Sequence, residues 1–407
     1  MMGLLDRLFS SKPPSKDQFA RQIMAGIKRA GEKRALVYDE DQFQLRTPEK
    51  DGPFFNLANA YPEFCAAPKT MRAVVLKRWI RVWFGKEIPG DFEDVRPDLL
   101  PSVQARSHYE LLDLQFQVEG RGALNRPCQI FAEHFAAGLV YDLPESMQHV
   151  NQDTLGKWGV TLYEALELAR QNLAEKPFAF LGPSEGEGLW CAMQKDSYAA
   201  ARILLLDTIR GFRVRGDIVA MVPNREMLLV AGSDDLPSLQ GMLRLATEAI
   251  QQPRRISGIA LRLDGDEWAP WLPDAGHPLY WDFRKLQTQT FGQAYAEQKE
   301  LLDKLHRQTG EDVFVGSFLG MGREGTNELT SYCVWGKGAT VAGLLPRTDL
   351  IAFFKQDYKP LLVPWERAAE VVGSLMQPMG MYPERWRVLE FPSDEQLQAL
   401  GCERAKP

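Results

Sequence analysis

The sequence lacks any long hydrophobic stretch. Among its 407 residues, no run reaches the roughly 18 apolar residues that a membrane-spanning helix requires. We therefore predict no transmembrane segment. The apolar start, residues 1–9, is too short for a secretory signal peptide and has no small-residue cleavage site. We expect it to pack on its own domain rather than to form a surface-docking helix.

Cysteine and histidine are both scarce, with five of each in the chain. The cysteines are odd in number, far apart and without a C-x-x-C pair, which argues against a disulfide framework and a zinc knuckle. A reducing cytoplasm fits this pattern best. No H-E-x-x-H or H-x-H pair places two imidazoles together. We therefore predict neither a metal nor a cofactor.

Excess positive charge is also missing. The formal net charge is −6, whereas proteins that hold nucleic acid carry surplus Lys and Arg against the phosphates. This disfavours a nucleic-acid partner. Hydrophobic residues make up 45% and charged residues 25% of the chain, as in ordinary globular proteins. At this length we expect two or three domains rather than one core.

Local signals place several helices and strands. Capping boxes at Ser15–Gln18 and Thr161–Glu164 predict two helix starts, because each pair satisfies amide donors left free at a helix N-terminus. A long helix is expected from about residue 287 to 307. Apolar runs separated by prolines predict strands joined by tight turns. The fold class is therefore α+β, with mainly antiparallel sheets of Pro-turned hairpins and amphipathic helices packed on one face.

Changes in composition suggest the domain boundaries. We expect an N-terminal α/β domain over residues 1–125 and a hairpin–helix α+β domain over 126–263. A Trp- and Pro-rich linker over 264–286 would then lead to a strand-rich α+β domain over 287–407. The hairpins around Pro223 and Pro346 also share an order of strand, turn, strand, helix and strand. This order is compatible with a duplication, but two unrelated hairpins would look alike at this level and are the favoured interpretation.

Four stretches of the sequence resemble a known bacterial family. They are residues 56–61 (NLANAY), 92–101 (FEDVRPDLLP), 138–147 (GLVYDLPESM) and 219–225 (VAMVPNR). The chain resembles the YtpQ-like family, catalogued as domain of unknown function 1444 (DUF1444), from about residue 15 to about residue 355. The resemblance implies a cytoplasmic bacterial protein of unassigned activity, and it supplies no catalytic residues.

Two glycine motifs are candidate active-site loops. Residues 320–325 (GMGREG) match the G-x-G-x-x-G pattern, which binds a dinucleotide only between a strand and a helix. Residues 182–186 (GPSEG) match the G-x-S-x-G pattern, in which Ser184 would be the nucleophile at a strand-to-helix turn. Both motifs precede stretches that predict strands. We therefore expect a hairpin loop at the first and no nucleophile at the second.

Polar residues around the first hairpin offer an alternative, enzymatic function. Glu133, His134, Asp142 and His149 would form an acid–base or metal cluster if the fold brought them together. The chain would then be an unrecognised hydrolase, which a metal ion could assist. The simpler interpretation is that these four are ordinary polar residues of a hairpin. Acidic groups such as those at 234–235 and 264–267 are explained by turns and helix caps.

The aromatic content of residues 264–286 suggests an interaction surface. Trp268, Trp271, Tyr280 and Trp281 lie between prolines without periodicity. Tyr and Trp combine apolar area with a polar tip and often anchor interfaces. The alternative is that these rings pack on the adjacent domain. We predict a non-enzymatic protein-binding or adaptor protein, whose partner is another protein and whose contact surface is this segment.

Overall fold

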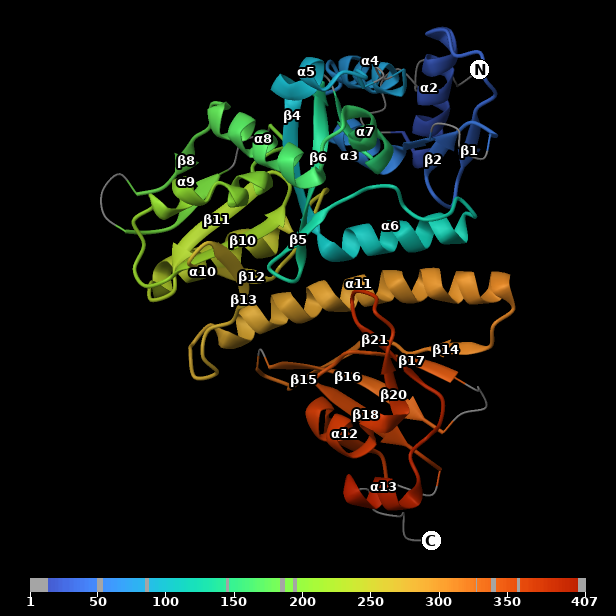
Figure 1. Cartoon of the computed structure of the whole chain (residues 1–407), viewed down its shortest axis with the longest axis vertical. Helices are drawn as coiled ribbons and strands as arrows, with labels where there is room; N and C mark the ends of the chain where they lie inside the picture. Colours follow the sequence, from blue (N-terminus) through green and yellow to red (C-terminus); the bar gives the residue numbers. More distant parts are fainter. Residues whose placement is uncertain are drawn as a thin grey trace, which may run out of the picture.

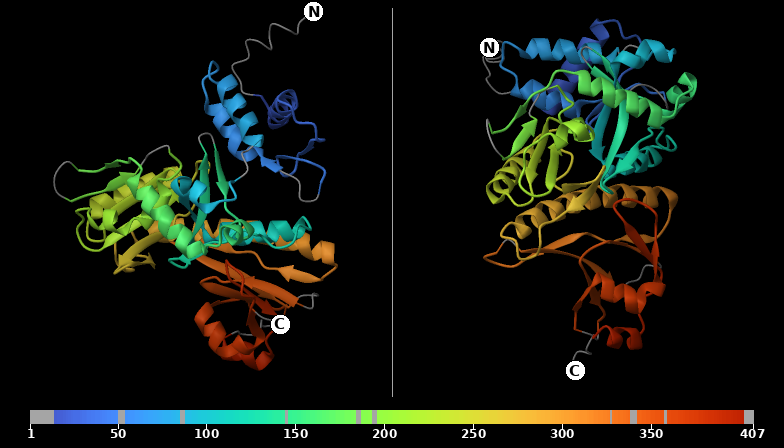
Figure 2. Two further views of the ribbon diagram at one scale, coloured as in Figure 1. Left: turned by 45° about the horizontal axis from the view of Figure 1, so that its top comes forward. Right: turned by 60° about the vertical axis from the view of Figure 1, so that its left-hand side comes forward.

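The computed structural model (Figures 1 and 2) describes residues 14–49, 54–84, 88–143, 146–183, 187–192, 196–326, 328–337, 342–356 and 359–401. Over these ranges the strands form five sheets, in which antiparallel pairs predominate. Helices alternate with the sheets along the chain, which confirms the predicted α+β class. None of the described helices combines the length and the apolar character needed to cross a membrane.

The N-terminal part packs helices on a small sheet. Its elements are α2 (Lys16–Arg29), β1 (Val37–Asp39), β2 (Gln44–Arg46), β3 (Phe54–Asn56), α3 (Leu57–Ala66) and α4 (Arg72–Trp83). The predicted capping box begins α2, where the Gln18 amide donates to Ser15 Oγ and the Ser15 amide donates to Gln18 Oε1. Apolar residues at helical spacing, among them Phe19 and Ile23, form one face of α2, and this face packs in the local core.

A four-stranded sheet forms the centre of the molecule. Its strands are β4 (Leu99–Ala105), β5 (Gln129–Phe131), β6 (Phe135–Leu143) and β7 (Ser146–His149). Strand β6 pairs with β4 along one edge, while β5 and β7 pair with successive halves of its other edge. The neighbouring helices are α5 (Phe92–Val95), η1 (Arg96–Asp98), α6 (Arg106–Val118), α7 (Gln152–Trp158) and α8 (Leu162–Glu175). The Thr161–Glu164 capping box begins α8 as predicted.

A six-stranded antiparallel sheet lies beside it, in the order β13-β12-β10-β11-β9-β8. The strands are β8 (Phe180–Leu181), β9 (Trp190–Ala192), β10 (Ile218–Asn224), β11 (Met227–Gly232), β12 (Ala260–Asp264) and β13 (Glu267–Trp271). The helices are η2 (Ala200–Leu204), α9 (Leu206–Arg210) and α10 (Leu236–Ala249). Helix α10 covers one face of this sheet, while η2 and residues of the central sheet pack on the other.

The long helix α11 (Tyr280–Thr309) leads from this sheet into the C-terminal part and runs beside α6 (Figures 1 and 2). Two further sheets follow, in the orders β15-β16-β18-β19 and β14-β17-β21-β20. Their strands are β14 (Val313–Val315), β15 (Leu319–Gly322), β16 (Leu329–Gly336), β17 (Ala342–Pro346), β18 (Leu350–Phe354), β19 (Leu361–Pro364), β20 (Met376–Pro378) and β21 (Arg385–Val388). Helices α12 (Trp365–Val372), η3 (Gly373–Leu375) and α13 (Asp394–Ala399) complete the fold.

Residues 264–286 differ from the irregular segment that their composition suggests. Strand β13 pairs with β12 through a tight turn, where Gly265 has a φ of 57° that suits glycine. Helix α11 begins at Tyr280, seven residues before the predicted start at 287. The segment therefore contains a strand of a hairpin and the first turns of a helix. Trp268, Pro270 and Trp271 lie in β13, and Tyr280 and Trp281 begin α11.

The two hairpins compared in the sequence differ in space. Strands β10 and β11 form an antiparallel hairpin, and Pro223 lies inside β10, so the turn itself is made by Arg225 and Glu226. Strands β17 and β18, which flank the end of the other stretch, belong to different sheets. The chain therefore passes from one sheet to the other after Pro346, where β17 ends. The shared order of elements does not reflect two equivalent hairpins.

Candidate functional site

The four aromatic residues predicted as a contact surface are held within the fold. Trp268 is buried, and its Nε1 donates to a carbonyl oxygen of η2 at 3.1 Å. Trp271 lies against Phe283 with ring centres 5.3 Å apart. Tyr280 and Trp281 contact each other at the start of α11, and both are half-buried. The burial of Trp268 makes it a core residue, so these four side chains do not present one free surface.

The residues of the alternative hydrolase hypothesis lie at two ends of the central sheet. Glu133 and His134 precede β6, and His134 Nδ1 is 2.6 Å from the Tyr382 hydroxyl of the C-terminal part. Asp142 and His149 lie toward the other end of β6 and on β7. Within the described ranges, no group of three or more His, Cys, Asp and Glu side chains is arranged to hold a metal ion. The four residues therefore do not converge.

The glycine motif at 320–325 belongs to a hairpin. Gly320 and Gly322 lie in β15, which pairs antiparallel with β16, so the helix that a dinucleotide site needs does not follow. This confirms the predicted hairpin. Ser184 lies outside the described residues. The predicted helix-cap role of the acidic pair at 234–235 is also confirmed, because Asp235 Oδ1 accepts a hydrogen bond from the Ser238 amide at the start of α10.

An open groove lies between α6 and α11, and a strip of leucines forms part of its mostly polar lining. Its volume is about 850 Å³, within the range of about 300–1,000 Å³ that ligand sites usually have. We call it the α6–α11 groove. The residues that define it are Leu111, Leu112 and Gln115 of α6, Gln293 and Leu301 of α11, and Ile256 from the loop before β12. The three leucines are only partly buried by the rest of the fold.

The two helices are held together at one side of this groove. Leu114 of α6 and Leu302 of α11 are buried in a shared apolar cluster with β14 and β17. Leu111, Leu112 and Leu301 line the groove beside this cluster, and Leu301 also packs against the cluster itself. The packing that joins α6 to α11 therefore leaves a neighbouring apolar strip open.

The charges along the rim of the groove are paired with each other. Arg255 Nη2 lies 2.6 Å from Glu297 Oε1, and Lys304 Nζ lies 2.8 Å from Glu300 Oε1. Such exposed pairs leave little net charge at the rim. The groove therefore offers apolar side chains and glutamine amides, and it favours an occupant without strong net charge.

His108 lines the groove near the start of α6. Its side chain is open to solvent, yet the protein surrounds it on most sides. Desolvation by the protein atoms around it, followed by the charges of Arg126 and Arg225, lowers the pKa of His108 below its usual value. The imidazole is therefore neutral at pH 7.

Comparisons with known proteins do not identify a relative. No protein-family model matches the sequence, and neither the curated proteins nor the solved structures compared with it gave a significant match. The functional argument therefore depends on the geometry of the chain itself. Sequence reasoning missed the groove, because its two walls come from helices far apart in the chain and neither carries a local motif.

Proposed function

We propose that this protein is a non-enzymatic binding protein that holds a segment of another protein in the α6–α11 groove. The observation that supports this proposal is the open strip formed by Leu111, Leu112 and Leu301 between two packed helices. Apolar grooves between helices commonly accept the apolar face of a peptide. This replaces the Trp- and Pro-rich segment as the proposed contact surface.

The polar groups of the groove favour a peptide over a purely apolar ligand. Gln104 and Gln293 line it with amide groups, each of which can donate and accept hydrogen bonds. A peptide backbone needs both kinds of partner when it leaves water. The paired rim charges add no strong preference for an acidic or a basic segment.

The proposal can be tested by site-specific photo-crosslinking in cells. A photoreactive amino acid at position 112 or 301 faces the groove, whereas one at the exposed position Gln289 lies on the same helix α11 outside the groove. We expect positions 112 and 301 to crosslink to one contiguous segment of one partner. A synthetic peptide of that segment should bind the purified protein, and Leu301→Glu should weaken binding at least tenfold, about 1.4 kcal/mol.

Two results would contradict the proposal. One is that the groove positions give no product beyond those obtained at position 289. The other is that the peptide binds Leu301→Glu as tightly as the natural chain. Because Leu301 is only partly buried, the glutamate is tolerated by the fold, and an unchanged thermal midpoint would confirm this.

We also propose kinship with the YtpQ-like family and a bacterial, cytoplasmic origin. The support is the four sequence stretches at 56–61, 92–101, 138–147 and 219–225. These four stretches contribute in turn to β3 and α3, to α5, η1 and β4, to β6 and β7, and to β10. A multiple alignment that preserved these stretches across the family would support the kinship, and their loss in authentic members would contradict it.

A further inference from the structure

One face of β6 and β7 carries a row of polar and small residues. Asp142 pairs with Met147, and Val140 pairs with His149, so these four side chains point to the same side of the sheet. Gly138 continues this row along β6 without a side chain. Tyr109 of α6 fills the space beside Gly138 and Val140 is fully buried, so the accessible part of this face lies around Met147 and His149.

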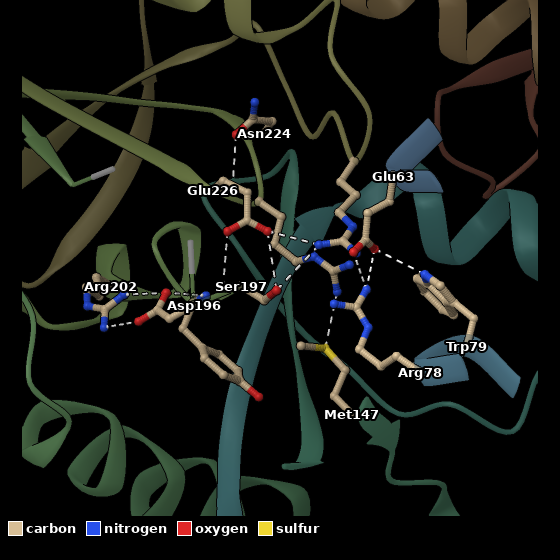
Figure 3. Close-up of polar contacts among 12 residues, drawn as sticks. Glu63, Arg78, Trp79, Met147, Asp196, Ser197, Arg202, Asn224 and Glu226 are labelled. Carbon is tan, nitrogen blue, oxygen red and sulfur yellow. Dashed lines mark hydrogen bonds and ion pairs between the residues drawn. The ribbon is translucent and has the colours of Figure 1, made fainter. Parts of the chain in front are cut away.

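The β10–β11 hairpin brings Arg225 to this face. Asn224 fixes the turn, since its Oδ1 accepts from the Glu226 amide at 3.0 Å and its Nδ2 donates to Ala249 O at 3.1 Å. The Arg225 Nη1 then donates to Met147 Sδ at 3.2 Å. Figure 3 shows Met147, Asn224 and Glu226 in this region. A thioether is a weak acceptor, so this contact satisfies the guanidinium N–H groups poorly, and the charge of the neighbouring Glu226 acts on Arg225 without an ion pair.

A second arginine approaches from the loop before β5. Asn125 anchors this loop next to the end of β7, because its Oδ1 accepts from the Gln152 amide at 3.0 Å and its Nδ2 donates to Asp153 at 2.8 Å. The adjacent Arg126 lies close enough to His149 to act on it electrostatically. The charges of Arg126 and Arg225 therefore both act on the same imidazole.

The carboxylates around this face are already engaged. Glu226 is bound to Arg254 at 3.1 Å, Asp196 to Arg202 at 2.6 Å and Asp142 to Lys176 at 2.8 Å. Figure 3 shows Glu226, Asp196 and Arg202. Within the described part of the chain, neither Arg126 nor Arg225 has a carboxylate within ion-pair distance. Among the described residues, the two guanidinium groups thus have no ion-pair partner of their own, and Asp142, which lies on the same face, is bound to Lys176.

Buried polar atoms at this face also lack partners. Arg225 Nε and His149 Nδ1 are both inaccessible to solvent and make no hydrogen bond within the described residues. Burial, followed by the charges of Arg126, His108 and Arg225, lowers the pKa of His149 to about 3. Buried donors without partners are rare in folded proteins and point to a missing ligand or water. The rest of each side chain keeps partial solvent access, and His108 is exposed.

We propose that Arg126, Arg225, His108 and His149 form a binding site for an oxyanion of the phosphate class. Guanidinium groups match phosphate oxygens with paired N–H donors, and they supply the charge that the neutral imidazoles lack. The imidazoles add hydrogen-bonding groups beside the arginines. Arg126 and Arg225 lie outside the α6–α11 groove, whereas His108 also lines it, so the variants described below are made at the two arginines.

Phosphate is favoured over a carboxylate by the number of donors that converge. Two guanidinium groups approach the same imidazole from different elements, so they can contact different oxygens of one tetrahedral anion. A carboxylate has two oxygens in one plane and satisfies one such fork. The phosphate group can belong to the free inorganic ion or to a small phosphate monoester, and the binding measurements below separate these sources.

The site can be tested by calorimetry and thermal unfolding of the full chain. Inorganic phosphate, glycerol 3-phosphate and acetate are titrated at constant ionic strength, maintained with sodium chloride. We expect saturable binding and a raised unfolding midpoint with phosphate or its monoester, and at least tenfold weaker binding of acetate. Tighter binding of the monoester would identify an esterified ligand, whereas equal or tighter binding of phosphate would identify the free ion.

Variants distinguish a binding site from a structural contact. Arg225→Gln and Arg126→Gln should each weaken phosphate binding at least tenfold. Arg244→Gln, at an exposed position of α10, removes the same charge away from the site and should bind like the natural chain. Without ligand, Arg225→Gln should keep or raise the unfolding midpoint, because it removes a cation that makes no ion pair within the described residues.

Three results would overturn the proposal. The first is stabilisation by phosphate no greater than by sodium chloride of equal ionic strength. The second is unchanged phosphate binding in both Arg225→Gln and Arg126→Gln. The third is an equal loss of binding in Arg244→Gln, which would show that only the overall charge matters. These variants leave the α6–α11 groove unaltered, so failure here is separate from failure of the peptide-binding proposal.

Discussion

Replacing the buried Arg385 should destabilise the C-terminal part strongly. Its side chain is only 1% exposed. The guanidinium donates to Gln298 Oε1 at 2.6 Å and to the carbonyl oxygens of Gly316 at 2.8 Å, Leu344 at 3.2 Å and Tyr295 at 3.2 Å. Burial lowers its pKa to about 10, so it remains charged at pH 7. One side chain thus links α11, the β14–β15 loop, β17 and β21.

The cost of Arg385→Met follows from the acceptors that it leaves. A buried acceptor without a donor costs about 1–3 kcal/mol. Leu344 O keeps its bond from the Gly316 amide, and water entry and small shifts recover part of the loss at the other three acceptors, so we expect about 3–5 kcal/mol in total. Arg385→Lys keeps the charge but cannot reach every acceptor, so its loss should be smaller.

Urea denaturation followed by tryptophan fluorescence measures this loss, since Trp335, Trp365 and Trp386 report on the C-terminal part. Arg387→Met is the matched control, because Arg387 lies two positions along the same strand and is exposed. We expect the control to change the free energy of unfolding by less than about 0.5 kcal/mol. A loss in Arg385→Met below about 1 kcal/mol, or equal to the control, would refute the reasoning.

Two further changes test the central sheet. Gly138→Ala places a methyl group against the buried Tyr109 hydroxyl, so we expect about 1–3 kcal/mol of destabilisation and a lower thermal midpoint; an unchanged midpoint would contradict this. Burial lowers the pKa of His134 to about 4, so below pH 6.5 the unfolded chain takes up a proton that the folded chain does not. Stability should therefore fall by about 2 kcal/mol from pH 6.5 to pH 5, and His134→Gln should remove this component of the slope. Equal slopes would contradict the burial of a neutral imidazole.

The sequence predicts those features whose causes are local. The Ser15 and Thr161 capping boxes depend on residues three positions apart, and both form as predicted. The hairpin that follows Gly320 is likewise recognisable, because the apolar run after the glycines has the alternation of a strand. Short-range hydrogen bonds and side-chain periodicity are enough to specify these elements.

Residues 264–286 show how a local signal can be outweighed by composition. Asp264-Gly265 between apolar runs is a strong hairpin signal, and the turn forms there. The density of tryptophan and proline nevertheless suggested an irregular linker. Whether Trp268 is buried depends on η2, which lies far away in the sequence and supplies the acceptor for its indole. Alternation within 267–271 was the signal that could have placed Trp268 inward.

The proposed sites were beyond local reasoning for a related reason. Arg126 lies in the loop before β5 of the central sheet, and Arg225 lies in the β10–β11 turn of the six-stranded sheet. Only the packing of the β10–β11 hairpin on β7 lets both charges act on the imidazole of His149. His149 was singled out from the sequence, but with Glu133 and Asp142 as its expected partners. The structure gives it cationic neighbours instead, which changes the chemistry that the residue can support from metal binding to anion binding.

The other buried arginines show why the pair at β7 points to a ligand. This fold supplies oxygen acceptors to guanidinium groups that it buries: Arg385 has four, and Arg202 has both carboxylate oxygens of Asp196, with only its Nε making no hydrogen bond within the described residues. Arg225 instead contacts a methionine sulfur, while the adjacent Glu226 is bound to Arg254. Desolvating a cation without an acceptor costs more than the thioether contact returns. An external oxyanion would supply the acceptor that the chain itself provides at Arg202 and Arg385.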